Sequence, residues 1–253
     1  MKKAKKKIAM IIATIAVVAV SFGATYAFLT DQTKEVQNEF TPNDNIKVEI
    51  EEPNWDGDED GDGHYGKKDA ENYTAAQLIE KDPYLVNAST ATNHTDEYVS
   101  MELHYEIKGT DGSMHEVTYA EFNKLATVYY KGTEGFNSDW KALADYENGE
   151  NDRFYYGDLT VLEKDAKTTP IFDEVKINPA LTLNQYDAEG NVVLDESGNP
   201  VEAQLTLTDI NGNSFTTKGM PEFQIKVKGF AVQADNIEIS EAKTELLNLM
   251  KAN

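Results

Sequence analysis

The sequence has no cysteine and only four histidines among its 253 residues. Disulfides therefore cannot cross-link the fold, and thiol chemistry is excluded. Basic residues are also scarce, because 23 lysines and arginines face 45 acidic residues, for a formal charge of −22. So acidic a chain disfavours nucleic acid and anionic membranes as partners and suits a cation or a cationic partner. Simple solubility explains the same charge equally well.

Long hydrophobic runs are also missing, except near the start of the chain. The apolar run at residues 8–22 follows five lysines and ends in small residues. Its length of about 15 residues is short of the roughly 20 that span a bilayer comfortably. This order of basic, apolar and small residues is typical of a secretory signal peptide. We therefore expect cleavage between Ala27 and Phe28; an uncleaved membrane anchor is the alternative.

Cleavage at this point leaves an even more acidic mature chain, with 18 basic and 45 acidic residues and a charge of −27. The chain has no sortase-type motif and no hydrophobic tail at its C-terminus. We expect a secreted protein, in the extracellular matrix or at the cell surface, with no stable membrane insertion after cleavage and no nucleic-acid partner.

Alternating apolar residues predict strands at several places. The clearest lies at residues 98–107, where apolar side chains alternate from Val99 to Ile107 and polar ones, such as His104, occupy the other face. Shorter alternations predict strands at residues 45–51 and 223–232. In the second of these the phase slips at Gly229, which predicts a β-bulge.

Helices and turns have weaker signals. Apolar residues three or four apart predict short helices at residues 119–128 and 138–146. Ser240, followed by acidic residues and then leucines, predicts the N-cap of a C-terminal helix. Two similar turns, at residues 187–191 and 195–199, predict a small hairpin that protrudes from the main sheet.

Many short strands with Gly/Asn turns are typical of an antiparallel sandwich. We predict an all-β-dominated chain that folds as a jelly-roll-like antiparallel β-sandwich with short helical insertions and a C-terminal helix. Its expected parts are a removed signal peptide (1–27), an N-terminal arm (28–44), a β-sandwich domain (45–239) with an acidic loop (54–69), and the C-terminal helix (240–253).

The junction at residues 23–31, GATYAFLTD, is the most specific motif of the chain, and NEFTP and a predicted strand follow it. These segments resemble the TasA/camelysin family, in which a TYAxxxD junction leads into NxFxxG and a first strand. KDPYLVN at residues 81–87, EYV at 97–99 and FAVQAD at 230–235 are similar to further family motifs. The chain departs from the family at residues 43–45, where many members have glycine, and at the acidic loop.

The resemblance implies export through a SipW-type signal peptidase, a jelly-roll fold and a role as a structural subunit of matrix or surface fibres. Family fibres grow when the N-terminal segment of one subunit adds as a strand to the next. By position this segment is residues 28–40, whose apolar residues include Phe28, Leu29, Val36 and Phe40. A sheet edge accepts a strand through backbone hydrogen bonds, and a head-to-tail contact that does not close builds a filament.

The partners that follow are a homopolymer and, as further candidates, other matrix or surface proteins. The alternative for an isolated monomer is that residues 28–40 fold back onto their own sheet or stay disordered.

The acidic loop has a calcium-binding spacing. Counted from Asp58, Asp60 is third, Asp62 fifth, Gly63 sixth and Asp69 twelfth. These are side-chain positions of an EF-hand-like loop, with Asp in place of the usual Glu at position twelve. The loop is a candidate calcium site. A solvated acidic loop is the alternative, because no convincing helix is predicted beside it.

The sequence contains no complete catalytic motif of the kinds considered. Camelysin has been described as a metalloprotease, but a zincin needs H-E-x-x-H, and His115-Glu116 supplies only half of it. The other histidines, His64, His94 and His104, have no partner at ligand spacing. We therefore expect no enzyme. The alternatives to a fibre subunit are a calcium-dependent surface binding module or adhesin and a camelysin-like metalloprotease.

Overall fold

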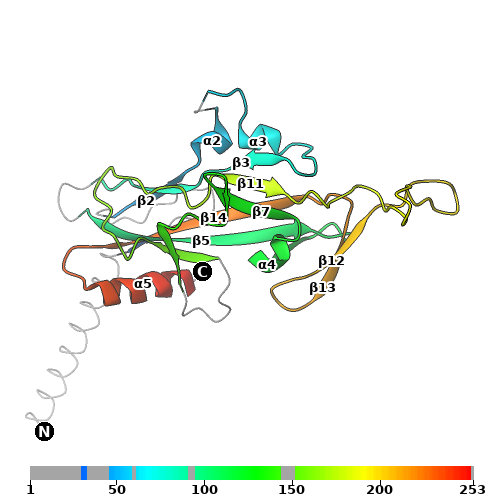
Figure 1. The fold of residues 1–253 in the computed structure, drawn as a ribbon. Coiled ribbons are helices and arrows are strands. Elements are labelled where there is room, and N and C mark those ends of the chain that lie inside the picture. The colour runs from blue at the N-terminus through cyan, green and yellow to red at the C-terminus, as the bar shows by residue number, and fades with distance from the viewer. Residues whose placement is uncertain (1–29, 33–45, 59–60, 91–94, 144–151, 252–253) are drawn as a thin grey trace, which may run out of the picture.

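The structure is a computed structural model that describes residues 30–32, 46–58, 61–90, 95–143 and 152–251 (Figure 1). The predicted signal peptide and most of the N-terminal arm lie outside these residues. Strands dominate, all sheets are antiparallel, and a helix ends the described chain. In this part of the chain, no helix is long and apolar enough to cross a membrane.

Two layers of strands face each other across the core (Figure 1). The larger sheet has the order β1-β14-β5-β10-β9, with β6 also paired to β5. Its strands are β1 (Thr30–Gln32), β5 (Glu97–Lys108), β6 (Met114–Val117), β9 (Trp140–Ala142), β10 (Arg153–Tyr156) and β14 (Phe223–Gln233).

The opposite layer holds a four-stranded sheet, β3-β11-β7-β8, and the pair β2-β4. Its strands are β2 (Val48–Glu51), β3 (Leu78–Glu80), β4 (Tyr84–Asn87), β7 (Ala126–Tyr130), β8 (Thr133–Glu134) and β11 (Glu174–Ile177). The remaining elements are α2 (Pro53–Asp56), α3 (Gly66–Asp69), α4 (Tyr119–Phe122), the hairpin β12 (Gln204–Thr208) and β13 (Ser214–Lys218), and α5 (Ile239–Lys251).

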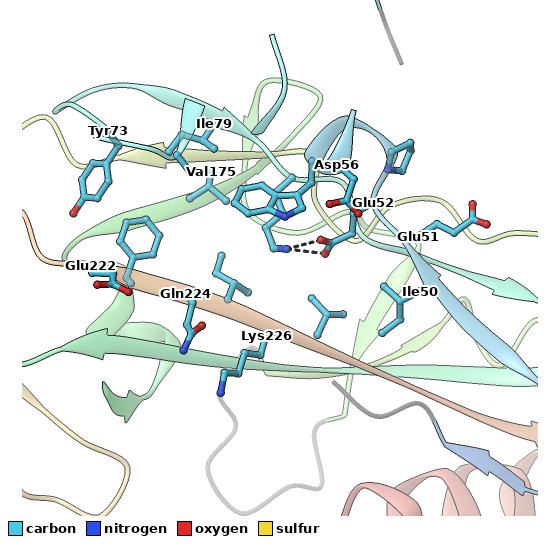
Figure 2. Close-up of a pocket in the computed structure, with 17 residues that line it drawn as sticks. Ile50, Glu51, Glu52, Asp56, Tyr73, Ile79, Val175, Glu222, Gln224 and Lys226 are labelled. Atoms are coloured by element: carbon cyan, nitrogen blue, oxygen red, sulfur yellow. Dashed lines mark hydrogen bonds and ion pairs between the residues drawn. The ribbon is translucent and has the colours of Figure 1, made fainter. Parts of the chain in front are cut away.

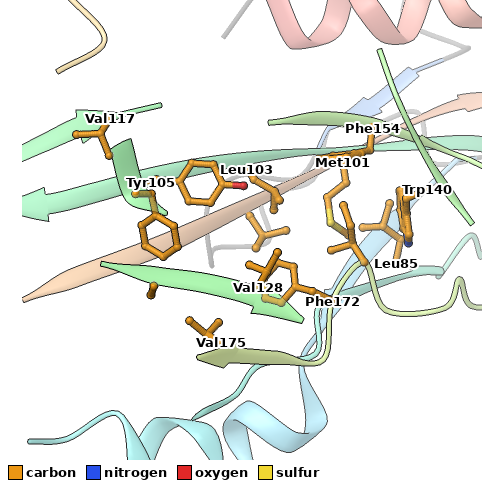
Figure 3. Packing of buried hydrophobic residues seen from close by; sticks show 14 of the residues in the cluster. Leu85, Met101, Leu103, Tyr105, Val117, Val128, Trp140, Phe154, Phe172 and Val175 are labelled. Atoms are coloured by element: carbon orange, nitrogen blue, oxygen red, sulfur yellow. The ribbon is translucent and has the colours of Figure 1, made fainter. Parts of the chain in front are cut away.

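Large apolar side chains fill the space between the two layers (Figure 3). Tyr105, Phe122 and Phe172 are fully buried there. The alternating residues of β5, from Val99 to Ile107, all point into this core, which confirms the strand and the face predicted from the sequence. The predicted strand at residues 45–51 is also present, as β2 with Val48 buried.

A second, smaller core lies on the far face of the larger sheet, under α5. Leu246 and Met250 of the helix pack with Tyr98, Phe230 and Val232. The predicted C-terminal helix is therefore confirmed, but it begins at Ile239, so that Ser240 lies inside the helix and is not its N-cap.

The β-bulge predicted at Gly229 is wrong. Pairing between β14 and β5 runs without interruption from Phe223↔Ile107 to Gln233↔Glu97. The apolar phase changes because α5 covers the far face at one end of the strand, so Phe230 and Val232 are buried on that face. A strand that is covered on both faces loses simple alternation without any change in its backbone.

Both helices predicted in the middle of the chain are also largely wrong. In the first, Thr118 caps a single turn, α4, by accepting the Glu121 N–H at 3.3 Å. The chain then becomes β7, which pairs with β11. In the second, Trp140–Ala142 is β9, paired with β10. Strand pairing outweighs the weak helical spacing because it satisfies the backbone of β-branched and aromatic residues.

An ionic cluster lies on the far face of the larger sheet. His104 Nδ1 is 2.5 Å from Glu116 Oε1, and its Nε2 is 3.3 Å from Glu102 Oε2. Arg153 Nη2 lies 2.5 Å from the other oxygen of Glu102. Burial opposes a charge on His104, but the carboxylates of Glu102 and Glu116 beside its ring raise its pKa from 6.5 to about 9. His104 is therefore a charged, half-buried part of the fold.

This cluster makes stability depend on pH. Since the folded pKa of His104 lies above 6.5, its contribution is fully present below pH 6.5 and is lost as pH rises through about 9. Below pH 6.5 we expect wild type to exceed His104→Gln by about 1–3 kcal/mol in the free energy of unfolding. Above pH 9 the two should converge. Urea unfolding across this range measures the difference, and a gap that stays constant contradicts the assignment.

Candidate functional site

A groove of about 970 Å³ lies between β14 and the opposite layer (Figure 2). Glu222 and the first half of β14, residues 223–227, form one wall. The facing wall has apolar side chains from several elements: Ile50 of β2, Trp55 of α2, Ile79 of β3 and Val175 of β11. It also has charged side chains, those of Glu51, Glu52, Asp56 and Lys81. Elements that are far apart in the sequence therefore build one site with a mixed apolar and charged lining.

The edge of β14 that borders the groove has no strand partner among the described residues over its first half. β5 occupies the other edge, and β1 pairs only with Phe230–Val232. By contrast, β5 continues alongside β14 through all eleven residues of that strand. Among the described residues, no strand therefore borders this edge over residues 223–227, and we call this stretch the open edge of β14.

The backbone groups at this edge point toward the groove. Just beyond the two ends of the β14–β5 ladder, the Lys108 N–H donates to Glu222 O at 2.8 Å and the Ala234 N–H donates to Asp96 O at 2.7 Å. Even-numbered residues of β14 therefore bond to β5, since backbone groups alternate between the two edges of a strand. The N–H and C=O groups of Phe223, Ile225 and Val227 face the other way, where no described strand pairs with them.

The short helices α2 and α3 lie at the groove, on the side of the opposite layer. Lys81 Nζ lies 2.7 and 2.8 Å from the two carboxylate oxygens of Glu52 and 4.8 Å from the centroid of the Trp55 ring (Figure 2). A Cβ atom on Gly66 would lie 1.6 Å from Glu80 O and 2.6 Å from Trp55 Cε3. Only glycine fits at this position, because α3 packs directly on β3 and on the indole ring.

Two further contacts hold the groove in shape. The buried Asp82 carboxylate accepts the Asn54 N–H at 3.0 Å, and burial raises the pKa of Asp82 to about 6. At the other end, the Tyr73 hydroxyl donates to Pro221 O at 2.5 Å. The Tyr73 ring meets the Phe223 ring edge-on, at 5.4 Å between centroids. The first contact holds α2 against the segment between β3 and β4, and the contacts of Tyr73 reach the start of β14.

The predicted assembly segment is only partly described. Ala27, Phe28, Leu29, Val36 and Phe40 all lie outside the described residues. The three described residues of the arm, Thr30–Gln32, form β1, which pairs antiparallel with β14 of the same chain. This part of the arm therefore lies on its own sheet, beside the open edge and in line with it.

The predicted acidic loop, residues 54–69, includes most of the single-turn helix α2 at its start and all of α3 at its end, and Asp69 is the last residue of α3. Its sixth position turns sharply, since Gly63 has φ +91° and its N–H donates to Asp58 at 3.1 Å. Asp62 accepts the His64 N–H at 2.7 Å. Asp60 lies outside the described residues, and the described ones contain no cluster of three or more acidic or histidine side chains that could hold a metal.

The histidines stay apart in the described structure. His115 stacks on Phe215 with 4.2 Å between ring centroids and lies 3.1 Å from Asp111. His104 belongs to the ionic cluster, and His64 lies 3.3 Å from Asp69. His94 is outside the described residues.

The sequence indicated the strand that carries the groove but not the groove itself. The alternation of Phe223, Ile225 and Val227 marks an apolar face, whereas nothing local shows that the neighbouring edge is open. Comparison of the chain with models of known protein families, with curated proteins and with solved structures found no match.

Proposed function

We propose that the protein is a secreted structural subunit of extracellular matrix or cell-surface fibres and that it assembles by adding its N-terminal segment to the next subunit. The open edge of β14 is the observation that carries this proposal. Three residues there present backbone donors and acceptors toward a groove whose far wall includes the apolar side chains of Ile50, Trp55, Ile79 and Val175. An extended peptide binds such a site through its backbone, while alternate side chains enter the groove.

The strand register favours a donor from another subunit. A strand that continued the register of β1 would set Glu35 opposite Val227 and Glu39 opposite Phe223. Residues opposite each other share a face of the sheet, so these carboxylates would point at apolar side chains. A register one residue along sets Val36 opposite Val227 and Phe40 opposite Phe223 instead. A strand that comes from another subunit is free to take this register.

The proposal also includes the other expectations from the family resemblance: export, a matrix or surface location, and a jelly-roll connection of the strands. A fibre subunit needs no catalytic group, and we propose no enzymatic activity. The acidic surface fits an exported, highly soluble subunit that polymerises through backbone contacts and apolar side chains rather than through charge.

Removing the donor should stop growth without removing the acceptor. Chains that start at Phe28 are expected to form filaments visible by electron microscopy. Chains that start at Thr41 should remain monomers, and small amounts of them should cap growing filaments of the longer chain. Thermal unfolding by circular dichroism serves as the control for folding. Filaments of the shorter chain would contradict strand donation by residues 28–40.

A second candidate function is calcium-dependent binding at the surface, with Asp58, Asp60, Asp62 and Asp69 as the proposed ligands. It is favoured by the sharp turn at Gly63 and by its hydrogen bond to Asp58, which bring the first and sixth positions together. Oxygen ligands suit a hard cation such as calcium.

Calorimetric titration tests the calcium site. We expect saturable heat from wild type and binding at least about ten-fold weaker in Asp58→Ala and Asp62→Ala, since each removes a charged ligand. Glu71→Ala, an exposed acid just outside the loop, is the matched control and should bind as wild type does. No heat from wild type would rule out the site.

A further inference from the structure

The segment between β11 and β12 projects from the body as an arm (Figure 1). In this subsection the arm means residues 183–203, which are separate from the N-terminal arm at residues 28–44. None of its residues is buried, nor are the residues that flank it from Asn178 to Thr206. A stretch of this length without a core contributes little to folding through burial, so its form calls for another explanation.

Hydrogen bonds nevertheless give the arm a defined backbone. Val193 donates to Gln185 O, Val201 donates to Val193 O, and Gln185 donates to Val201 O, at 2.8 to 2.9 Å. These three residues, spaced eight apart, close a ring of backbone bonds. The arm is therefore more elaborate than the single hairpin predicted from its two turns.

Its turns share one chemistry. In the turn that starts at Asp187, the Asp Oδ1 accepts the Glu189 N–H at 3.0 Å and the Asn191 N–H at 2.8 Å. The turn that starts at Asp195 and the β12–β13 turn that starts at Asp209 repeat both bonds. These bonds lower the pKa values of all three aspartates. The charged form that stabilises each turn is therefore present at neutral pH.

The arm also carries exposed apolar side chains. Seven large apolar residues are exposed in the described chain, and three of them lie in the arm: Leu183, Tyr186 and Leu194, which are 63%, 52% and 57% exposed. A fourth, Ile210, lies at the β12–β13 turn. Exposed apolar groups in such number on a projecting element are typical of a docking surface.

The charge around these residues determines the kind of partner. Between Lys176 and Lys218 there is no lysine, arginine or histidine, but there are six acidic residues. A second copy of this chain fits poorly, because its arm carries the same charge and its groove is lined by four acids and two lysines. A basic partner satisfies the charge and covers the apolar residues.

We propose that the arm docks a basic, amphipathic segment of a different protein, with its apolar side chains on Leu183, Tyr186 and Leu194 and its lysines or arginines on the surrounding carboxylates. The arm is distinct from the groove at β14, and this docking does not require the fibre function proposed above.

The test uses the full mature chain and a fluorescein-labelled peptide that alternates lysine with valine. In one variant an Asn-Gly turn replaces residues 184–202, which is possible because the Ala203 N–H already donates to Leu183 O at 2.9 Å. Fluorescence anisotropy should show affinity at least about ten-fold lower for this variant. The triple substitution Leu183→Ser, Tyr186→Ser and Leu194→Ser should have the same effect.

Matched controls separate the arm from the acidic surface as a whole. Serine at Leu78, Val161 and Ile239, the three exposed apolar residues of the body, should leave the affinity unchanged. Peptides that alternate lysine with serine, or glutamate with valine, should bind at least about ten-fold more weakly to wild type. Equal binding by wild type and the arm-excision variant would overturn the proposal, as would self-association that depends on the arm. Filament formation by the excision variant is scored separately, since it reports on the groove.

Discussion

Replacing Ile225 with proline is expected to abolish filament growth while the monomer stays folded. The Ile225 N–H faces the open edge of β14 and takes no part in the β14–β5 ladder. Of the backbone groups, proline therefore removes only a donor that an incoming strand needs. The ring also blocks close approach of a second strand. We expect elongation to fall by at least about ten-fold, measured by light scattering and electron microscopy.

Ile225→Ala is the control for this substitution. It removes the same side chain from the groove but keeps the backbone N–H, so elongation should fall less than in the proline variant. Urea unfolding of both monomers shows whether β14 still pairs with β5. If the proline variant elongates as fast as wild type, then the edge at residues 223–227 does not accept the donor strand.

Replacing Gly66 with alanine is expected to destabilise the fold strongly. The new Cβ would lie 1.6 Å from Glu80 O, so either α3 or β3 has to move. Overpacking of this kind costs about 1–3 kcal/mol, and here the atom that is hit is backbone rather than a flexible side chain. We expect a loss of about 2–3 kcal/mol in the free energy of unfolding.

Tryptophan fluorescence localises this effect. Trp55 lines the groove, and its Cε3 would lie 2.6 Å from the new methyl group, so its emission should change. Trp140, the only other tryptophan, donates to Thr169 O at 2.9 Å and serves as the reference in a Trp55→Phe background. Gly57→Ala is the matched control, because the nearest atom to its Cβ, Pro53 O, is 3.5 Å away. Equal stability of the two variants would contradict the packing argument.

The predictions that rested on strong local sequence patterns are confirmed in the fold. The alternation in β5 predicted both the strand and its buried face, because one face of that strand meets a continuous core. The repeated turns at Asp187 and Asp195 are also present, since an Asx side chain and a glycine at positive φ fold such turns from local bonds alone.

Where the local sequence pattern was weak or ambiguous, contacts with distant parts of the chain determined the structure. Residues 126–130 are a strand because β11 pairs with them, and β11 lies more than 40 residues further along the chain. The apparent phase slip at Gly229 arises because α5, which follows in sequence, covers the far face of β14. His104 looks like a surface residue in the sequence, yet Glu102 and Glu116 hold it charged and half-buried.

The sequence by itself determined the absence of cysteine chemistry, the acidic charge, the strand-rich class and the C-terminal helix, because these depend on composition and on contacts between near neighbours. It also predicted the export segment and the calcium spacing, which remain predictions. Only the tertiary structure decided where the larger sheet ends and which walls face that edge. An open edge depends on which distant strands pair with each other. A local sequence pattern does not show whether a strand has a partner on both of its edges.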